Sequence, residues 1–299
     1  MNQIDYKLLR ALNAVIQCQS FEGAASKLCI SQSAVSQRVK QLEEFVGHPV
    51  LIRGRPITLT PIGSQLVGHF KQVDQLEREL VPKILPESPL QPIKLSISVN
   101  ADSLAIWFIE ALAPLIKFNP IELDIIVSDE SRTTDKLKSG EAYGAISTME
   151  HPLPGYRCDY LGDLKYVLVA SKGFQARYFA NGVNHESLKL APGVAYDQLD
   201  NMHLKFIHDN FGLPPGSYPC HTVRSSEAFV ELAKKGLAYT LIPKQQIEKE
   251  LKKKELVNLL PGKSLSNKLY WHSWLMGKGV FKKASELIIN YARNYLPYE

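Results

Sequence analysis

The sequence is poor in the features that would indicate a disulfide framework, a metal centre or a membrane anchor. Its four cysteines are scattered, with no Cys-x-x-Cys pair and no histidine cluster at metal-ligand spacing. We therefore expect no disulfides, no metal and no cofactor, and Cys18 and Cys29 are interpreted as small buried hydrophobic residues. No apolar stretch approaches the length of a membrane span. The first ten residues are too polar for a signal peptide, so we expect a cytoplasmic protein without a membrane partner.

Sequence motifs of common enzymes are also missing. The chain contains no Gly-x-Gly-x-x-Gly, no Gly-x-Ser-x-Gly and no P-loop. An enzyme is therefore not expected, although an enzyme fused to a nucleic-acid module stays an alternative. With 299 residues, 45% of them hydrophobic, the chain can bury more than one core and predicts two or more domains. Its net charge of +5 is compatible with a nucleic-acid partner, and the basic residues are not grouped in a tail.

The most informative segment runs from Phe21 to Glu43, where two short amphipathic helices meet at a tight turn. Ala24 and Ala25 are small enough to let the first helix lie close to its neighbour, as a helix-turn-helix requires. Ser31 is a suitable N-cap for the second helix. The apolar positions of that helix recur at helical spacing and should face inward: Val35, Val39, Leu42 and Val46.

The opposite face of the second helix is polar. Glutamine and serine can exchange hydrogen bonds with base edges in a major groove, whereas lysine and arginine serve phosphates and guanines. Residues 50–60 follow as a predicted hairpin wing with Ile52, Ile57 and Leu59 as its anchors. We predict that double-stranded DNA is contacted by Ser31, Gln32, Ser33, Ser36, Gln37, Lys40, Arg53 and Arg55. The alternative is an ordinary packed helical hairpin whose polar residues are only solvated surface.

The same residues carry a family resemblance. The pattern Phe-x-x-Ala-Ala-x-x-Leu-x-x-Ser-Gln-Ser-Ala-Val-Ser-Gln-x-x-Lys-x-Leu-Glu resembles the N-terminal domain of LysR-type transcriptional regulators. The likeness continues through Gly47, Pro49, Arg53, Leu59-Thr60 and Gly63. It implies a winged helix-turn-helix over residues 1–60. The wing departs from the family pattern because its two arginines, Arg53 and Arg55, are two positions apart instead of three.

A long helix should begin at Pro61, because proline is favoured in a first helical turn. Its apolar residues form a coiled-coil-like seam that Glu77 interrupts: Leu66, Phe70, Val73 and Leu80. Either the body of the domain or a second subunit must cover that seam. The family uses this helix to dimerise, so we expect a homodimer, and dimers that could pair into tetramers. Four prolines between positions 82 and 92 then mark a boundary, so residues 61–92 are the predicted linker.

From residue 93 onward, strands and helices alternate, which predicts a mostly parallel sheet covered by helices. The strands are expected at 93–99, 123–127, 144–147, 166–170, 193–196, 221–223, 239–242 and 268–274. Helices are expected at 104–116, 133–138, 203–211, 227–235 and 281–295. The predicted fold is therefore α/β, with an all-α-type winged helix-turn-helix N-terminal domain and a two-lobed effector domain like a periplasmic binding protein. Residues 93–164 and 269–299 form the first lobe, and residues 165–268 form the second.

Ligands of open α/β sheets sit beyond the carboxyl ends of strands, where helix N-termini can hold a carboxylate. Acidic residues at three such ends would complement a cation, so a basic amino acid fits both halves. The predicted effector-binding residues are Asn100, Asp102, Ser103, Asp129, Glu130, Thr133, Ser147 and Asp197. Helix capping is an equally good explanation for Asp102, Ser103, Asp129 and Thr133.

Four further segments, residues 100–105, 213–217, 225–230 and 269–272, resemble one subgroup of the LysR family. That subgroup regulates arginine and lysine export and is also described as an inhibitor of chromosome initiation. The resemblance implies lysine and arginine as effectors and promoters of amino-acid export and biosynthesis genes as targets. RNA polymerase is a further candidate partner. The competing hypothesis is an architectural DNA-binding protein that blocks replication origins without an obligatory ligand.

Overall fold

The computed structural model describes residues 4–84, 92–128, 133–197 and 201–297. Contacts divide the chain into two compact units. Unit 1 comprises residues 1–98, 120–126 and 134–145, and unit 2 comprises residues 99–119, 127–133 and 146–299. One buried hydrophobic cluster lies within unit 1, between residues 9 and 70, and another lies within unit 2, between residues 167 and 256.

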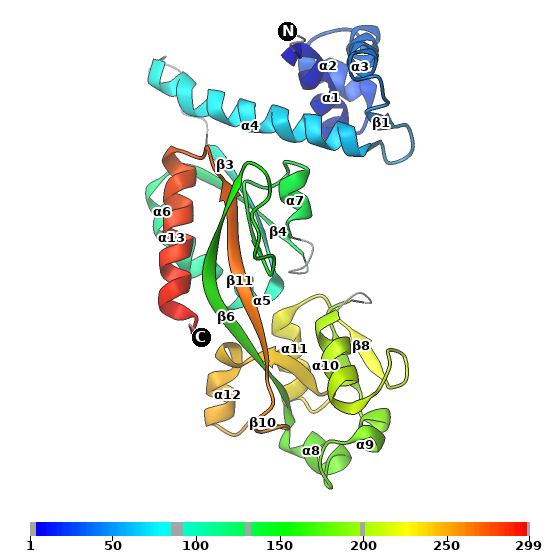
Figure 1. The fold of residues 1–299 in the computed structure, drawn as a ribbon, viewed down its shortest axis with the longest axis vertical. Coiled ribbons are helices and arrows are strands. Elements are labelled where there is room, and N and C mark those ends of the chain that lie inside the picture. The colour runs from blue at the N-terminus through cyan, green and yellow to red at the C-terminus, as the bar shows by residue number, and fades with distance from the viewer. Residues whose placement is uncertain (1–3, 85–91, 129–132, 198–200, 298–299) are drawn as a thin grey trace. The chain divides into compact units, whose positions relative to one another are not determined.

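Unit 1 begins with three helices, α1 (Tyr6–Cys18), α2 (Phe21–Leu28) and α3 (Gln32–Val46), shown in blue in Figure 1. Each begins where a polar side chain accepts a hydrogen bond from a free backbone N–H of the first turn. Asp5, Ser20 and Ser31 are these N-caps, which confirms the cap predicted for Ser31. The predicted inward residues Val35, Val39 and Leu42 are buried. Cys29 is exposed at the left-handed end of α2, so the interpretation of this residue as buried was wrong.

The wing consists of β1 (Leu51–Ile52) and β2 (Thr58–Leu59), paired antiparallel with Leu51 opposite Leu59. A wing was predicted here, but Ile52 was wrongly expected to anchor it to the core. Ile52 is 55% exposed, whereas Leu51 is buried in the core. Successive strand residues point to opposite faces, so only one of these two can reach the core.

Helix α4 (Pro61–Ile84) begins at the predicted proline and is longer than expected. Its first half packs on α1–α3: Val67 and Phe70 belong to the same buried core, and Leu66 lies against it. The body of the domain therefore covers this part of the seam, which corrects the expectation that a second subunit covers Phe70. Leu80, further along, is 54% exposed.

The remainder of unit 1 holds β3 (Ile93–Val99), β4 (Ile121–Val127), α7 (Asp135–Lys138) and β5 (Gly144–Ser147). β3 lies between β4 and β5 in the sheet. β3 and β5 are parallel, with Ser98 opposite Ala145, as a strand–helix–strand alternation predicts. The division between the units passes through the carboxyl ends of these strands.

Helix α4 approaches this part of unit 1 through two glycines. A Cβ added to Gly140 would lie 2.2 Å from the Cα of Gly68, and Gly140 has a φ of +63°. Glycine is therefore required at position 140 for both space and backbone conformation.

Unit 2 is built around a long strand, β6 (Tyr156–Ser171), which lies between β10 (Leu256–Asn258) and β11 (Leu265–Trp274) and also pairs with β9 (Thr240–Pro243). All three pairings of β6 are antiparallel, so the expectation of a mostly parallel sheet was wrong for this part of the chain. Only residues 166–170 of β6 were predicted as a strand. The first half was missed because its burial does not alternate regularly. β7 (Gly193–Ala195) and β8 (Cys220–Thr222) form a small parallel sheet.

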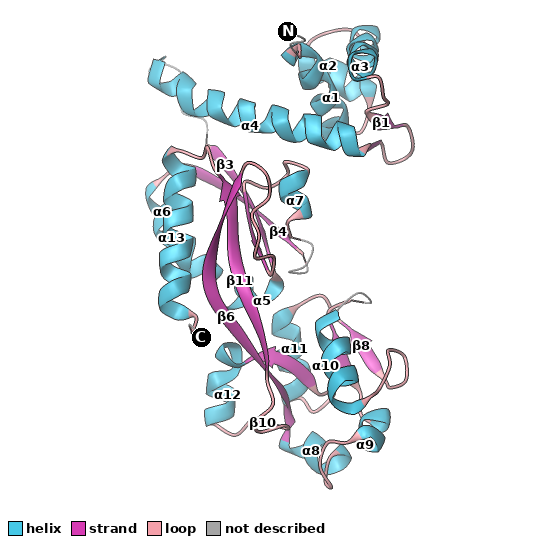
Figure 2. Ribbon diagram, in the orientation of Figure 1, coloured by secondary structure: helices cyan, strands magenta, loops and turns pink. Residues whose placement is uncertain are grey.

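The helices expected at 104–116, 203–211, 227–235 and 281–295 are present in unit 2, whereas two helices, over residues 172–178 and 185–190, were not predicted (Figure 2). The helices of unit 2 are α5 (Ala101–Ser103), a π-helical turn (Leu104–Phe108), α6 (Ile109–Phe118), α8 (Lys172–Tyr178), α9 (His185–Leu190), α10 (Asn201–Phe211), α11 (Ser226–Lys234), a 3₁₀ turn (Lys244–Ile247), α12 (Glu248–Lys252) and α13 (Gly279–Tyr295). α13 packs on α6 and β11, and the buried Trp271 donates its indole N–H to Ser285 over 3.0 Å. None of the helices in the described ranges is both long and apolar enough to cross a membrane.

Candidate functional site

Helix α3 presents its polar residues to solvent. Gln32, Ser33, Ser36, Gln37 and Lys40 are all exposed, so the predicted outward face is confirmed. The Oγ of Ser31 accepts from the N–H of Ala34 over 3.2 Å and lies 2.9 Å from the Oγ of Ser33. The helix is thereby fixed by its cap, while its outer side chains stay accessible to a partner.

Lys40 makes an ion pair with Glu44 one turn later, at 3.6 Å. Both side chains are more than 60% exposed, so the pair contributes little stability and leaves the ammonium accessible to a phosphate.

The wing is held by side chains that sequence reasoning did not identify. Gln19 pairs with the backbone of Ile57 in both directions, at 3.1 and 3.0 Å. Glu43 accepts from the N–H of Val50 over 3.0 Å. Between β1 and β2, Arg53 and Arg55 are exposed. No local signal could have found the contact between Gln19 and Ile57, because these residues are 38 positions apart.

The carboxyl ends of β3, β4 and β5 lie at one edge. The register pairs Ser98 with Ala145, so Asn100 and Ser147 each follow two residues further along neighbouring parallel strands. The N–H of Ser128, just after β4, donates to the carbonyl of Val99 over 3.1 Å. Two of the predicted residues are therefore brought to the same edge. Asp129 and Glu130 lie outside the described residues.

Five of the predicted effector residues are polar and buried, with at most 6% of their surface exposed: Asn100, Ser103, Thr133, Ser147 and Asp197. Asn100 is the N-cap residue of α5, but its side chain does not cap the helix. Both polar atoms of its amide, and the Oγ of Ser103, lack a hydrogen-bond partner within the described part of the chain. Capping therefore does not explain Asn100 or Ser103. Buried polar atoms of this kind call for water or a ligand.

Asp102 lies at the start of the same helical run and is hydrogen-bonded to residues far away in the sequence. Its Oδ2 accepts from the hydroxyl of Tyr166 at 2.6 Å, and its Oδ1 accepts from Ser226 at 2.5 Å. Ser226 Oγ also lies 3.0 Å from Oε1 of Gln246. Asp102 belongs to the first predicted lobe, and the other three residues belong to the second. We did not identify these three partners from the sequence, where Tyr166 is indistinguishable from a core strand residue.

Two of the three remaining predicted residues, Ser147 and Asp197, have different surroundings. Ser147 accepts from the N–H of Met149 over 2.9 Å in a local turn. Asp197 follows β7, which belongs to the small sheet. Nearby in the chain, burial lowers the pKa of His203 to about 4, and its ring stacks on Tyr239 at 5.9 Å. His203 is thus a buried residue that is held neutral.

Comparison with known families assigns the chain to a class. Residues 6–64 match the family described as "Bacterial regulatory helix-turn-helix protein, lysR family", and residues 91–279 match the "LysR substrate binding domain". The chain therefore belongs to the LysR family of DNA-binding transcriptional regulators, which is not an enzyme family. The fold class and the family resemblance predicted from the sequence are confirmed.

Within that family, the chain is 51% identical to the HTH-type transcriptional regulator ArgP of Aeromonas salmonicida, over 99% of each protein. Its structure is similar to that of ArgP from Mycobacterium tuberculosis, with a TM-score of 0.88, 29% identity, and coverage of 99% of this chain and 100% of that one. It is also similar to full-length LysG from Corynebacterium glutamicum with bound effector Arg, with a TM-score of 0.81, 27% identity, and coverage of 97% and 99%.

Proposed function

We propose that this regulator controls amino-acid export and biosynthesis genes and that lysine, arginine or both are its effectors. The observation that carries the proposal is the hydrogen-bonded carboxylate of Asp102, which lies beside buried polar atoms without partners. The similarity to LysG with bound arginine, and to regulators named ArgP, supports a basic amino acid. We also propose that RNA polymerase is a partner of this regulator and that the protein is located in the cytoplasm.

The chemistry of the site suits a basic amino acid. An ionised carboxylate has about four lone-pair directions, and Tyr166 and Ser226 use two of those on Asp102. A carboxylate at this position also attracts an ammonium or a guanidinium through its charge. The amide of Asn100 and the hydroxyl of Ser103 can donate to the α-carboxylate, because both groups are buried without a partner among the described residues. An architectural DNA-binding protein would gain nothing from such unsatisfied polar atoms.

Calorimetry on the full chain tests the effector. Lysine or arginine should bind saturably, and glutamate should not. Replacing Asp102 by Asn should weaken binding roughly ten- to hundredfold, since a charge-assisted hydrogen bond contributes about 1.5–3 kcal/mol. Glu110→Gln, at an exposed acid further along the same helical run, is the matched control. Binding of an uncharged or acidic metabolite instead would keep the regulator and discard the effector.

We also propose that α3 reads base edges through Gln32, Ser33 and Ser36, and that a homodimer formed through α4 recognises an interrupted inverted repeat. The exposed apolar residues near the end of α4, Leu80 and Ile84, support a second subunit there. Leu80→Asp should give monomers in sedimentation equilibrium with the helical signal retained. A stable dimer of this variant would refute dimerisation through α4.

A further inference from the structure

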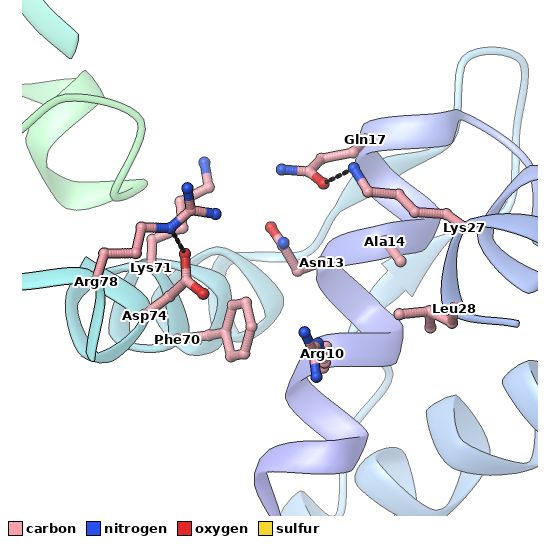
Figure 3. Close-up of a pocket in the computed structure, with 10 residues that line it drawn as sticks. All are labelled: Arg10, Asn13, Ala14, Gln17, Lys27, Leu28, Phe70, Lys71, Asp74 and Arg78. Atoms are coloured by element: carbon pink, nitrogen blue, oxygen red, sulfur yellow. Dashed lines mark hydrogen bonds and ion pairs between the residues drawn. The ribbon is translucent and has the colours of Figure 1, made fainter. Parts of the chain in front are cut away.

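A cavity of about 220 Å³ lies in unit 1 between α1, the end of α2 and the middle of α4 (Figure 3). None of its lining residues belongs to α3 or to the wing. It is therefore separate from the predicted DNA-contacting residues and from the effector residues.

The lining of this cavity is strongly basic. Arg10, Lys27, Lys71 and Arg78 contribute four positive charges, and Asp74 is its single carboxylate. The formal charge is thus +3, compared with +5 for the whole chain. Like charges gathered around one cavity repel each other; Arg10, Lys27 and Arg78 are exposed and Lys71 is half-buried, so water screens part of this repulsion.

The contacts of these cations leave most of that charge uncompensated. Arg78 donates through Nε to Asp74 over 2.8 Å, which leaves its other guanidinium N–H groups for a further acceptor. Lys27 donates to the Oε1 of Gln17 over 2.7 Å, a neutral partner. Lys71 is half-buried, and burial lowers its pKa while Glu141 acts in the opposite direction.

An amide completes the lining. In Figure 3, Asn13 of α1 lies across the cavity from Lys71 and Arg78 of α4. Its Oδ1 is buried and has no hydrogen-bond partner among the described residues. Rotation of the amide by half a turn brings its N–H₂ group to the position of Oδ1, so Asn13 can donate a hydrogen bond to an anion. Ala14 beside it is small and leaves the space open.

We propose that this cavity binds a small phosphorylated anion. A phosphate group carries about two negative charges at neutral pH and several acceptor oxygens, so it offsets most of the +3 lining. A guanidinium group can donate two parallel hydrogen bonds to two oxygens of a phosphate, and a lysine ammonium adds a compact positive charge. The anion would bridge α1 and α4, and its binding would stabilise the packing of the linker helix on the DNA-binding core.

Thermal melting and calorimetry on the full chain, with inorganic phosphate and pyrophosphate as probes and sodium chloride at equal ionic strength, test the site. Both probes should bind saturably and raise the melting temperature by a few degrees, because ligands of the native state stabilise it by mass action. Arg10→Gln and Arg78→Gln should each weaken the affinity for phosphate about tenfold. Lys7→Gln removes an exposed charge from the same helix α1 outside the cavity and should change nothing.

The proposal would be overturned if chloride raised the melting temperature as much as phosphate does. It would also be overturned if the variants at Arg10 and Arg78 bound phosphate as well as Lys7→Gln does. Succinate is included as a dianion without phosphorus. Tighter binding of succinate than of phosphate would also overturn the assignment to phosphate chemistry. Far-ultraviolet circular dichroism shows whether each variant is folded. If the Arg10 or the Arg78 variant is unfolded, Lys27→Gln is used in its place.

Discussion

Helix α3 and the sheet edge at the carboxyl ends of β3 and β5 both carry polar side chains proposed to bind a ligand, but the side chains of α3 are exposed and those of the edge are buried. On α3 the predicted contacts, Gln32 and Ser36 among them, come from one stretch of chain and are exposed. At the edge of the sheet, Asn100 and Ser103 are buried, and Asp102 is bonded to residues 64 and 124 positions away. Exposed residues on a capped helix can be exchanged at little structural cost, whereas buried polar groups must be satisfied. Binding and stability should therefore be separable on α3 and linked in the core of unit 2.

The largest effect is expected at Phe70, a buried apolar residue of α4 that belongs to the core of α1–α3. Phe70→Asp should destabilise unit 1 by about 3–5 kcal/mol or more, because it removes a buried ring and buries a charge in the core of α1–α3. Chemical denaturation and operator binding measure both consequences. Phe70→Leu is the control and should retain DNA binding. Wild-type stability of Phe70→Asp would mean that α4 does not pack on this core.

The stability of unit 2 should depend on pH through its buried histidines. Burial lowers the pKa of His203 to about 4, below its unfolded value of about 6.5, so the folded state holds it neutral. Its contribution to stability is complete above pH 6.5 and is lost as the pH falls toward 4, by up to about 3 kcal/mol. His272, whose pKa burial also lowers, acts with the same sign.

His203→Phe keeps a ring beside Tyr239 but cannot be protonated, so acid unfolding followed by tryptophan fluorescence should shift to lower pH. An unchanged acid midpoint would show that His203 is already protonated in the folded protein.

A smaller and purely functional effect is expected on α3. Gln32→Ala should lower the discrimination between operator and mismatched DNA by about 1–3 kcal/mol, the range for a good base contact, with unchanged stability. Competition binding with single-base operator variants measures it. Uniform weakening on every sequence would instead assign Gln32 to the DNA backbone.

The smallest expected effect concerns the wing. Arg53→Gln should weaken binding to all sequences alike and reduce the slope of log affinity against log salt by about one, because one phosphate contact is lost. Lys7→Gln is the charge-matched control outside the predicted interface. A change of sequence preference with an unchanged slope would move Arg53 to base readout.

The sequence was most informative where function depends on neighbouring residues. The cap at Ser31, the apolar stripe of Val35, Val39 and Leu42, and the polar face opposite them all follow from helical periodicity. Many of the strands and helices beyond residue 93 could be predicted from the alternation of apolar residues, but the short elements at 172–178, 185–190 and 256–258 were missed. Errors occurred where a local pattern has two solutions. At β1 we predicted that Ile52 faces the core, whereas Leu51 does. Along α4 the apolar seam did not reveal whether the same domain or a second subunit covers Phe70.

By itself, the sequence determined the family, the position of the polar helix α3, and the polar residues Asn100 and Ser147 that follow neighbouring strands, because short-range spacing controls all three. Only the tertiary structure decided that Gln19 and Glu43 hold the wing, that Phe70 belongs to the DNA-binding core, and that Tyr166 and Ser226 bind Asp102. Contacts between residues so distant along the chain depend on how strands and helices pack together, and neither hydrophobic period nor capping preference encodes that arrangement.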